Sequence, residues 1–254
     1  MAAGKGTRMQ SDIPKVLHKI SGKTLLNHVI TTAKDLNPDN IIVIIGYKST
    51  LVKQSIIEDN VLFSLQKNQY GTGHAVMQAE NHLRMFKGNT LVLSGDVPLI
   101  NSSTLTSLLA KHKLGEFDAC MLTANMKNPY GYGRVIRNNK GNLQKVQEHK
   151  DCNDDELKID EINSGIYVFD NQKLFELLPK LSNQNIQSEY YLPDVLSMIV
   201  QEKGKIGLEK IYNALKDQNK DVKLTIYDGV GHNSWDLTYD NQEIYDWLLS
   251  KENS

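Results

Sequence analysis

The chain has 254 residues and a formal net charge of −1, because 29 lysines and arginines stand against 30 aspartates and glutamates. This balance gives no electrostatic case for binding nucleic acid or an anionic membrane surface. Its two cysteines, Cys120 and Cys152, build neither a disulfide framework nor a metal cluster, and neither a signal peptide nor a membrane-spanning run is apparent, so we expect a reduced, cytoplasmic setting.

Short apolar segments alternate with helical patterns through the first 204 residues. β-branched runs predict strands at 40–47 and 89–100, and two further strands are expected at 118–126 and 161–170. The spacing of apolar residues predicts helices in the remaining segments, at 23–36, 73–86, 102–114, 171–181 and 188–204. This alternation predicts a doubly wound α/β fold with a mostly parallel sheet covered by helices on both faces.

The first segment, "MAAGKGTRMQSDIPK", has the composition of a phosphate-binding loop. Gly4 and Gly6 allow a sharp turn and close approach to a ligand, while Arg8 and Lys15 supply a guanidinium and an ammonium group. The loop lacks the spacing of a P-loop, and Met9 stands where a dinucleotide fingerprint needs its third glycine. From the glycines alone, an ordinary turn in a basic surface loop is an equally good interpretation.

Further blocks follow this loop in a characteristic order: "PKVLH", "SGKTLLNHVI", "LQKNQYGTGHAV", "LSGDVPLI", "YGYGRVIRN", "VQEHKD", "EINSGIYVF" and "SEYYLPDV". With "AAGKGTRM" they resemble the signature of sugar-nucleotide pyrophosphorylases, most closely the uridylyltransferase domain of the bacterial bifunctional N-acetylglucosamine-1-phosphate enzymes. The resemblance implies a Rossmann-like nucleotidyltransferase fold and an Mg²⁺-dependent reaction of UTP with N-acetylglucosamine-1-phosphate. The products are UDP-N-acetylglucosamine and pyrophosphate. The sugar phosphate is itself the nucleophile, so the protein positions the substrates and neutralises charge.

The resemblance implies catalytic roles for Arg8 and Lys15 at the triphosphate, and it places the side chains of Gln66 and Thr72 at the uracil. Backbone contacts to the nucleotide are implied for Ala2, Ala3, Gly4 and Gly71. The alternative interpretation is that the residues "GTGH" only turn a strand into the following helix, with Thr72 near the helix cap. Both roles are compatible.

Asp96 is the candidate Mg²⁺ ligand. It ends an apolar strand, and a carboxylate at the carboxyl edge of a parallel sheet lies where ligands bind in doubly wound folds. Without the neighbouring blocks, an aspartate in a "GDVP" turn would be the default interpretation.

By resemblance, Gly133, Glu148 and Asn163 contact the N-acetylglucosamine moiety. A carboxylate accepts hydrogen bonds from two hydroxyls, and an amide both donates and accepts. A solvated charge beside His149 and Lys150 is the alternative for Glu148.

Two stretches depart from the family pattern. The family has a hydrophobic strand before the glycine-rich loop, and Met1 stands where that strand should be ending, so we expect a truncated first strand near the middle of the sheet. The family also supplies a second metal ligand from a "GVN" segment. Matching "GVGHN" to it would select Asn233, but the flanking "SWDLTYD" argues against this, and the second ligand stays open.

We divide the chain into a nucleotidyltransferase domain, 1–204, and a segment, 205–254, with an expected helix, strand, turn and helix. The second part resembles the end of an α/β-hydrolase, with "GHNSWD" supplying His232. A G-x-S-x-G nucleophile elbow is absent, which disfavours a serine hydrolase. Two further alternatives are transfer to another sugar phosphate and a truncated or chimeric chain with impaired catalysis. The oligomeric state is not predicted.

Overall fold

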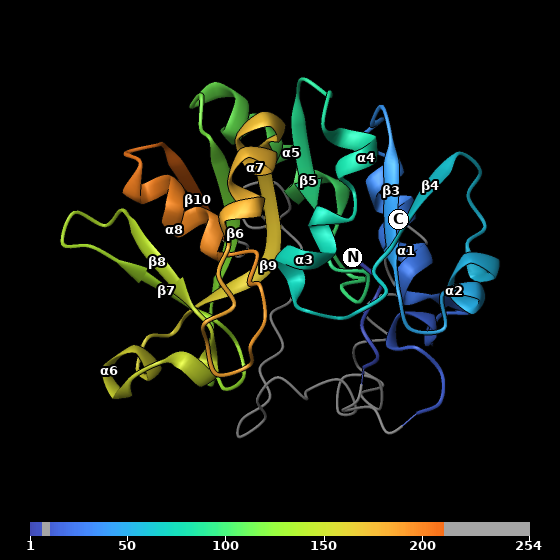
Figure 1. Cartoon of the computed structure of the whole chain (residues 1–254), viewed down its shortest axis with the longest axis horizontal. Coiled ribbons are helices and arrows are strands. Elements are labelled where there is room, and N and C mark those ends of the chain that lie inside the picture. Colours follow the sequence, from blue (N-terminus) through green and yellow to red (C-terminus); the bar gives the residue numbers. More distant parts are fainter. Residues whose placement is uncertain (7–10, 211–254) are drawn as a thin grey trace, which may run out of the picture.

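The computed structural model describes residues 1–6 and 11–210 (Figure 1). The strands are β1 (Lys19–Ile20), β2 (Lys23–Thr24), β3 (Ile41–Ile45), β4 (Val61–Leu65), β5 (Asn89–Val92), β6 (Ala119–Asn125), β7 (Arg134–Arg137), β8 (Leu143–Gln147), β9 (Glu161–Asp170) and β10 (Ile206–Lys210). The α-helices are α1 (Leu25–Lys34), α2 (Ser49–Ser55), α3 (Thr72–Met77), α4 (Glu80–Leu83), α5 (Ser102–Leu114), α6 (Asp154–Leu157), α7 (Asn171–Leu177) and α8 (Asp194–Gln201). Short 3₁₀ turns cover Lys15–Leu17, His149–Asp151 and Leu178–Lys180.

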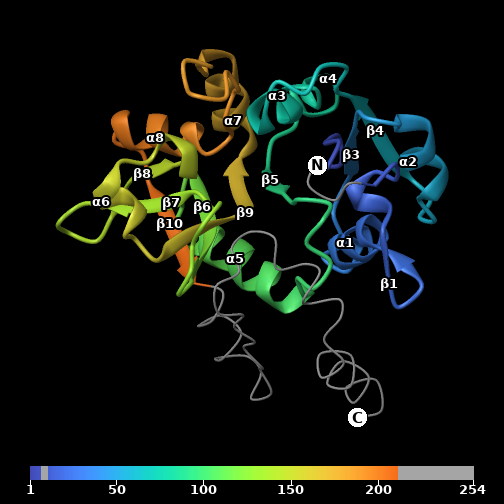
Figure 2. The same ribbon diagram turned by 90° about the horizontal axis from the view of Figure 1, so that it is seen from below.

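Most strands of the central sheet run in the same direction. β3 pairs in parallel with β4, and β6 pairs in parallel with β10. β9 is antiparallel to both β5 and β6, which are therefore parallel to each other. Helices α1 and α5 lie on one face, and α3, α4 and α7 lie on the other (Figure 2). The predicted doubly wound, mostly parallel α/β fold is confirmed.

Residues 1–3 join the two halves of this sheet. The Met1 amino group donates to the Leu93 carbonyl at 2.7 Å, and Gly95 N donates to the Met1 carbonyl at 2.8 Å. On the other side, Ala2 N donates to the Ile44 carbonyl at 2.7 Å. The N-terminus consequently lies between β3 and β5 (Figures 1 and 2). Residues 1–3 therefore lie near the middle of the sheet, where the first strand is expected.

Two predicted helices are shorter in the structure. The helix expected at 73–86 is divided into α3 and α4. At the junction, Gln78 N and Ala79 N donate to the carbonyls three residues earlier, Ala75 O and Val76 O, instead of four residues earlier as in an α-helix. The helix expected at 188–204 begins only at Asp194. The preceding residues have their backbone hydrogen bonds with the 70–73 loop, and Pro193 has no N–H to donate to a helix.

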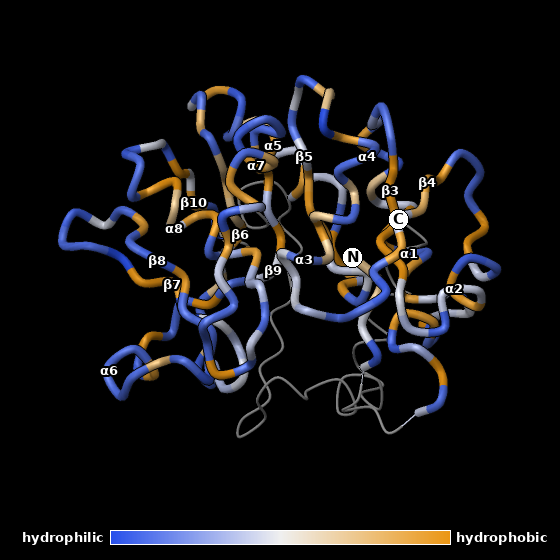
Figure 3. The backbone as a smooth tube through the Cα atoms, in the orientation of Figure 1, coloured by the Kyte–Doolittle hydropathy of each residue, from blue (hydrophilic) through white to orange (hydrophobic). Residues whose placement is uncertain are grey.

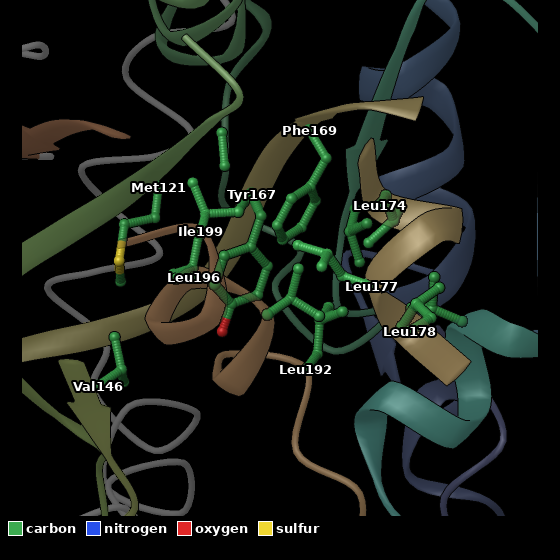
Figure 4. Close-up of a cluster of buried hydrophobic side chains, with 14 of the residues drawn as sticks. Met121, Val146, Tyr167, Phe169, Leu174, Leu177, Leu178, Leu192, Leu196 and Ile199 are labelled. Carbon is green, nitrogen blue, oxygen red and sulfur yellow. The ribbon is translucent and has the colours of Figure 1, made fainter. Parts of the chain in front are cut away.

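The largest cluster of buried apolar side chains lies between the sheet and helices α7 and α8 (Figure 4). The rings of Tyr167 and Phe169, both on β9, have their centroids 5.7 Å apart in this cluster. Apolar residues are also concentrated along β3 and β5 (Figure 3). Each large apolar side chain buried in this way contributes about 1.5–3 kcal/mol. The resulting core fixes the strands whose carboxyl ends carry the candidate site.

β10 extends the sheet beyond the expected domain boundary at residue 204. It pairs with β6 from Ile206 to Lys210, so these residues belong to the same sheet as the rest of the domain. The remainder of the 205–254 segment, with His232 and Asn233, lies outside the described residues. None of the helices in the described part of the chain combines the length and apolar character of a membrane span.

Candidate active site

The glycine-rich loop leaves the middle of the sheet directly after Ala3. Ala2 and Ala3 are buried, whereas Gly4 is exposed. Gly6 has a φ of +66°, and a β-carbon there would lie 2.7 Å from the Lys15 β-carbon. Only glycine fits this close approach at a positive φ. The loop and the Lys15 turn are therefore packed together, while Arg8 belongs to residues 7–10, outside the described part of the chain.

Lys15 and Asp96 form an ion pair beside this loop. Lys15 Nζ lies 2.8 Å from Asp96 Oδ2, and the side chains keep 18% and 28% of their exposure. Lys15 begins a 3₁₀ turn after Pro14, and Asp96 follows β5. The sequence predicts both residues as functional but not their direct pairing. Because both remain accessible, a ligand phosphate or cation can reach this pair.

The segment predicted to read the base forms a compact network. Gln66 is 3% exposed, and its Nε2 donates to the Gly71 carbonyl at 3.1 Å and lies 3.0 Å from His74 Nδ1. Gly71 has a φ of +103° and directly precedes α3, so the turn interpretation of "GTGH" describes the local structure. Thr72 opens α3, and its Oγ1 accepts from Leu192 N at 2.9 Å.

The loop at 70–73 is tightly packed against the "SEYYL" segment. Gly73 N donates to the Tyr190 carbonyl, and Tyr190 N donates to the Tyr70 carbonyl, both at 2.8 Å. A β-carbon at Gly71 would lie only 2.5 Å from the Tyr190 carbonyl oxygen. The two segments therefore act as one unit, although 120 positions separate Thr72 from Leu192 in the chain.

The three predicted sugar contacts lie together. Asn163 N donates to the Gly133 carbonyl at 2.9 Å, and a β-carbon at Gly133 would lie 3.4 Å from Glu148 Oε1. The Asn163 side-chain oxygen accepts from Gly165 N and from the Tyr167 hydroxyl, both at 2.9 Å. These two bonds fix the amide with its NH₂ group directed away from them, where it can donate to a ligand.

Glu148 is in an unusual electrostatic environment. Burial, together with the nearby charges of Asp194, Asp151 and Glu189, raises its pKa to about 7. Burial and Asp151 also raise the pKa of Asp194, to about 6. Near neutral pH the Glu148 carboxyl is therefore divided between its two protonation states, and it can donate as well as accept a hydrogen bond.

Two contacts connect the sugar group with the nucleotide group. A β-carbon at Gly165, on β9, would lie 3.4 Å from Ser94 Oγ, two residues before Asp96. In addition, the segment that packs on Gly71 leads directly into Asp194, whose charge acts on Glu148. The predicted residues that the structure describes thus gather along one edge of the sheet.

Several residues at this edge escaped prediction from the sequence. Tyr167 orients Asn163, and the Tyr191 hydroxyl donates to Asp151 Oδ2 at 3.2 Å. Arg134 is 2% exposed, and its guanidinium donates to the Tyr132 carbonyl in the loop before Gly133. Each of these residues acts by holding another residue in place, which a sequence motif does not reveal. Only Tyr167 could have been found, because residues four positions apart on one strand, such as Asn163 and Tyr167, lie on the same face.

The described residues contain no group of three or more His, Cys, Asp or Glu side chains arranged to hold a metal ion. Asp96 fits a different kind of site. Mg²⁺ often takes one or two carboxylates from the protein and completes its shell with water and substrate phosphates. A partly exposed carboxylate beside a phosphate-type loop satisfies that requirement.

Comparison with known proteins identifies the family of the chain. The family model for the MobA-like NTP transferase domain matches residues 1–156. The chain belongs to this family of nucleotidyltransferases. Two curated relatives, both named bifunctional protein GlmU, come from Clostridium acetobutylicum and Streptococcus mutans. The first is 48% identical over 207 residues, which are 82% of this chain and 45% of the relative. The second is 47% identical over 211 residues, which are 83% of this chain and 46% of the relative.

These relatives confirm the predicted resemblance to a pyrophosphorylase domain of the GlmU type, and the chain spans less than half of their length. Among solved structures, an inositol-1-phosphate CTP transferase from T. maritima gives a TM-score of 0.65 at 16% identity, with 82% of each chain covered. A UDP-glucose pyrophosphorylase complexed with UDP-glucose gives 0.61 at 19% identity, over 82% of this chain and 88% of that one. These two structures support the fold.

Proposed function

We propose that the chain transfers a uridylyl group from UTP to N-acetylglucosamine-1-phosphate and releases pyrophosphate. The observation that carries this proposal is the placement of the Lys15–Asp96 pair beside the glycine-rich loop, at the same sheet edge as Gly133, Glu148 and Asn163. The Lys15–Asp96 pair and the loop suit a triphosphate with its cation. Gly133, Glu148 and Asn163 suit the polar, uncharged sugar ring of a sugar phosphate. The family and its relatives are consistent with both substrates.

In this reaction an oxygen of the sugar phosphate attacks the α-phosphorus of UTP, and the bond from that phosphorus to the bridging oxygen of the β-phosphate breaks. Lys15 faces the α-phosphate, where its ammonium stabilises the charge that develops in the transition state. Arg8 is assigned to the β- and γ-phosphates, which leave as pyrophosphate. Backbone N–H groups of Ala3 and Gly4 are assigned to phosphate oxygens.

Asp96 is assigned to Mg²⁺, which neutralises phosphate charge when bound. In the structure its Oδ2 holds Lys15 at 2.8 Å. The Asp96 carboxylate therefore keeps the Lys15 ammonium near the loop before the substrates bind. When Mg²⁺ and the substrates are bound, the same carboxylate would hold the ammonium and the cation close together. The Asp96 side chain alone does not complete a metal site. Substrate phosphates and water can supply further ligands, and the second protein ligand is left unassigned.

Glu148 and Asn163 are assigned to the sugar hydroxyls and the acetamido group. The fixed amide of Asn163 donates through its NH₂, and Glu148 accepts when ionised. Gln66, Gly71 and Thr72 are assigned to uracil, with Gln66 acting from beneath the loop. A cytoplasmic location belongs to the same proposal, in keeping with the two free cysteines, Cys120 and Cys152.

The test is a pyrophosphate-release assay with the full chain, Mg²⁺, and crossed pairs of UTP or CTP with N-acetylglucosamine-1-phosphate or glucose-1-phosphate. We expect the highest kcat/KM for UTP with the acetamido sugar. Asp96→Asn should lower it by at least about 10²-fold, whereas the exposed Asp155→Asn, which keeps the same chemical change, should leave it unaltered.

The rival assignments give different results in the same assay. A preference for glucose-1-phosphate would favour transfer to another sugar phosphate. An absence of turnover, with no rise in melting temperature on adding UTP and Mg²⁺, would favour an impaired chain, because a ligand that binds the folded state must stabilise it.

A further inference from the structure

Residues 185–192 contain neither helix nor strand, and they contact both groups of the candidate active site. We call them the bridging segment. At its carboxyl end, Leu192 is fully buried in the core cluster, where Figure 4 labels it. Near its amino end, the Ile186 side chain keeps 69% of its exposure. Apolar packing therefore does not fix the exposed end of the bridging segment, and its hydrogen bonds decide where it lies.

The carboxyl end of the bridging segment is bonded to the loop at 70–73. The Tyr190 N–H and the Tyr190 carbonyl each form a backbone bond of 2.8 Å with this loop. Leu192 N donates to Thr72 Oγ1 at 2.9 Å. Three hydrogen bonds over three residues leave little freedom between the two stretches of chain. A change in the position of the loop therefore moves the bridging segment as well.

The other attachment of the bridging segment is the carboxylate of Asp151. Asp151 Oδ1 accepts from Ile186 N at 2.9 Å, and Asp151 Oδ2 accepts from the Tyr191 hydroxyl at 3.2 Å. Asp151 ends the 3₁₀ turn that begins directly after Glu148, and its own N–H donates to the Glu148 carbonyl at 2.9 Å. The side chain that holds the bridging segment is thus tied to the backbone of a predicted sugar contact.

Internal hydrogen bonds hold the bridging segment in one shape. The Asn185 side chain spans its turn, because Nδ2 donates to the Glu189 carbonyl at 2.6 Å and Oδ1 accepts from Glu189 N at 3.1 Å. Ser188 N donates to the Asn185 carbonyl at 3.0 Å. Since side-chain and backbone bonds close the same turn, a displacement at one end of the segment is carried to the other end.

We propose that Asp151 is a positioning residue that couples nucleotide binding to sugar binding, because its carboxylate ties the turn after Glu148 to the bridging segment. Uracil that fixes the loop at 70–73 then also fixes Glu148 for the sugar. The sugar gives the same advantage to the nucleotide, since coupling between two sites is reciprocal. Asp151 contacts neither substrate in this assignment. The inference rests on the proposed function, which identifies the loop and Glu148 as substrate contacts.

The coupling is measured by isothermal titration of the full chain with N-acetylglucosamine-1-phosphate, with and without saturating α,β-methylene-UTP and Mg²⁺. The methylene bridge replaces the oxygen that leaves, so no transfer takes place. In the parent chain the nucleotide should lower the Kd of the sugar phosphate at least about fivefold. Asp151→Ala should reduce this factor to about one, whereas Asp155→Ala, the same change at a side chain that keeps 91% of its exposure, should leave it unaltered.

Asp151→Asn separates the effect of hydrogen bonding from that of charge. The amide keeps an oxygen that accepts from Ile186 N, and its NH₂ can donate to the Tyr191 hydroxyl oxygen. It removes the negative charge that acts on Glu148. This variant should therefore keep a coupling factor of at least about threefold. A loss as complete as in Asp151→Ala would assign the effect to charge and overturn the proposal.

Amide hydrogen exchange on the unaltered chain tests the same link without any substitution. α,β-Methylene-UTP with Mg²⁺, in the absence of sugar, should slow exchange at Ile186, whose N–H is bonded to Asp151. The sugar phosphate alone should slow exchange at Gly73, whose N–H is bonded to Tyr190. Lys140, in an exposed turn, is the control and should exchange at the same rate throughout.

The outcomes distinguish this inference from the proposed function. A chain that binds both ligands, with a Kd for the sugar phosphate that does not respond to nucleotide, would overturn the coupling and leave the proposed function standing. A chain that binds neither ligand would overturn the proposed function and this inference with it. Coupling retained in Asp151→Ala, or unchanged exchange at Ile186 and Gly73 on ligand binding, would show that the bridging segment does not carry the effect.

Discussion

The ion pair between Lys15 and Asp96 joins a residue proposed to bind phosphate with a residue proposed to bind a cation. In the absence of ligand each neutralises the other at 2.8 Å, and a bound triphosphate and cation would compete for both. The pair is partly exposed, so its own contribution to stability is small, in the range of about 0–1 kcal/mol. Its importance lies in placing an ammonium where charge develops during the reaction.

Lys15→Ala should therefore lower kcat more than it raises KM for UTP. Removing one preorganised charge at a transferring phosphoryl group costs about 10²–10³ in kcat. Steady-state kinetics with UTP as the varied substrate separates the two effects. Lys19→Ala, on the exposed residue of β1, is the control. A rise in KM with unaltered kcat would mean that Lys15 binds substrate and transition state equally.

Glu148 makes stability depend on pH. Its folded pKa of about 7 lies above the ordinary value of 4.5, so the folded chain holds a proton that the unfolded chain has released. The free energy of unfolding should then be highest below pH 4.5 as far as this group is concerned, and should fall as pH rises through 7. Asp194, with a pKa raised to about 6, acts in the same direction.

Glu148→Gln should remove the larger of these contributions. At pH 8 the variant should be more stable than the parent chain by at most about 3 kcal/mol, and the two should converge towards pH 5. Urea unfolding at both pH values measures the difference. Glu116→Gln, at an exposed position, should leave the pH profile unchanged. A parallel shift at both pH values would show that Glu148 does not carry the proton.

At the scale of elements, local patterns predict strands well, because a short β-branched run between turn residues has few alternatives. Strands 41–45, 89–92 and 161–170 all fall inside predicted segments. Residues 188–193 show the limit of this method. Their spacing suits a helix, but their backbone groups bond to the loop at 70–73, and no local pattern contains that distant partner.

In the candidate site, too, local motifs reveal some residues, whereas contacts between distant segments could not be predicted. Gly71, Glu148 and Asn163 were predicted because short motifs carry them, and the structure places them at one edge. The clamp between Gly71 and Tyr190, the bond from Tyr167 to Asn163 and the charge of Asp194 near Glu148 arise only when distant segments meet. Roles that one residue exerts through another leave little trace in a sequence.

Gly71→Ala tests the clamp between the two segments. The new methyl group would lie 2.5 Å from the Tyr190 carbonyl, at a φ of +103°. Gly141→Ala is a close control, since Gly141 also has a positive φ, +79°, but no atom lies within 4 Å of the added carbon. Both changes place an alanine at a positive φ, at a cost of about 1–3 kcal/mol, and only the first adds a clash with backbone.

We expect a larger fall in melting temperature for Gly71→Ala than for Gly141→Ala, together with a raised KM for UTP in the first variant alone. Differential scanning calorimetry and the pyrophosphate assay supply the two readouts. Equal losses of stability and an unaltered KM would mean that the 70–73 loop adjusts without affecting the nucleotide.

At the scale of the whole molecule, the described residues form a sheet of two halves that are joined by few hydrogen bonds. The half with β3 and β4 meets the half with β5, β9, β6 and β10 through residues 1–3. A cavity of about 290 Å³ lies beside this junction, between β3 and β5, and apolar side chains of α1 and α3 line it. Cooperativity between the halves should therefore be weak compared with that inside each half.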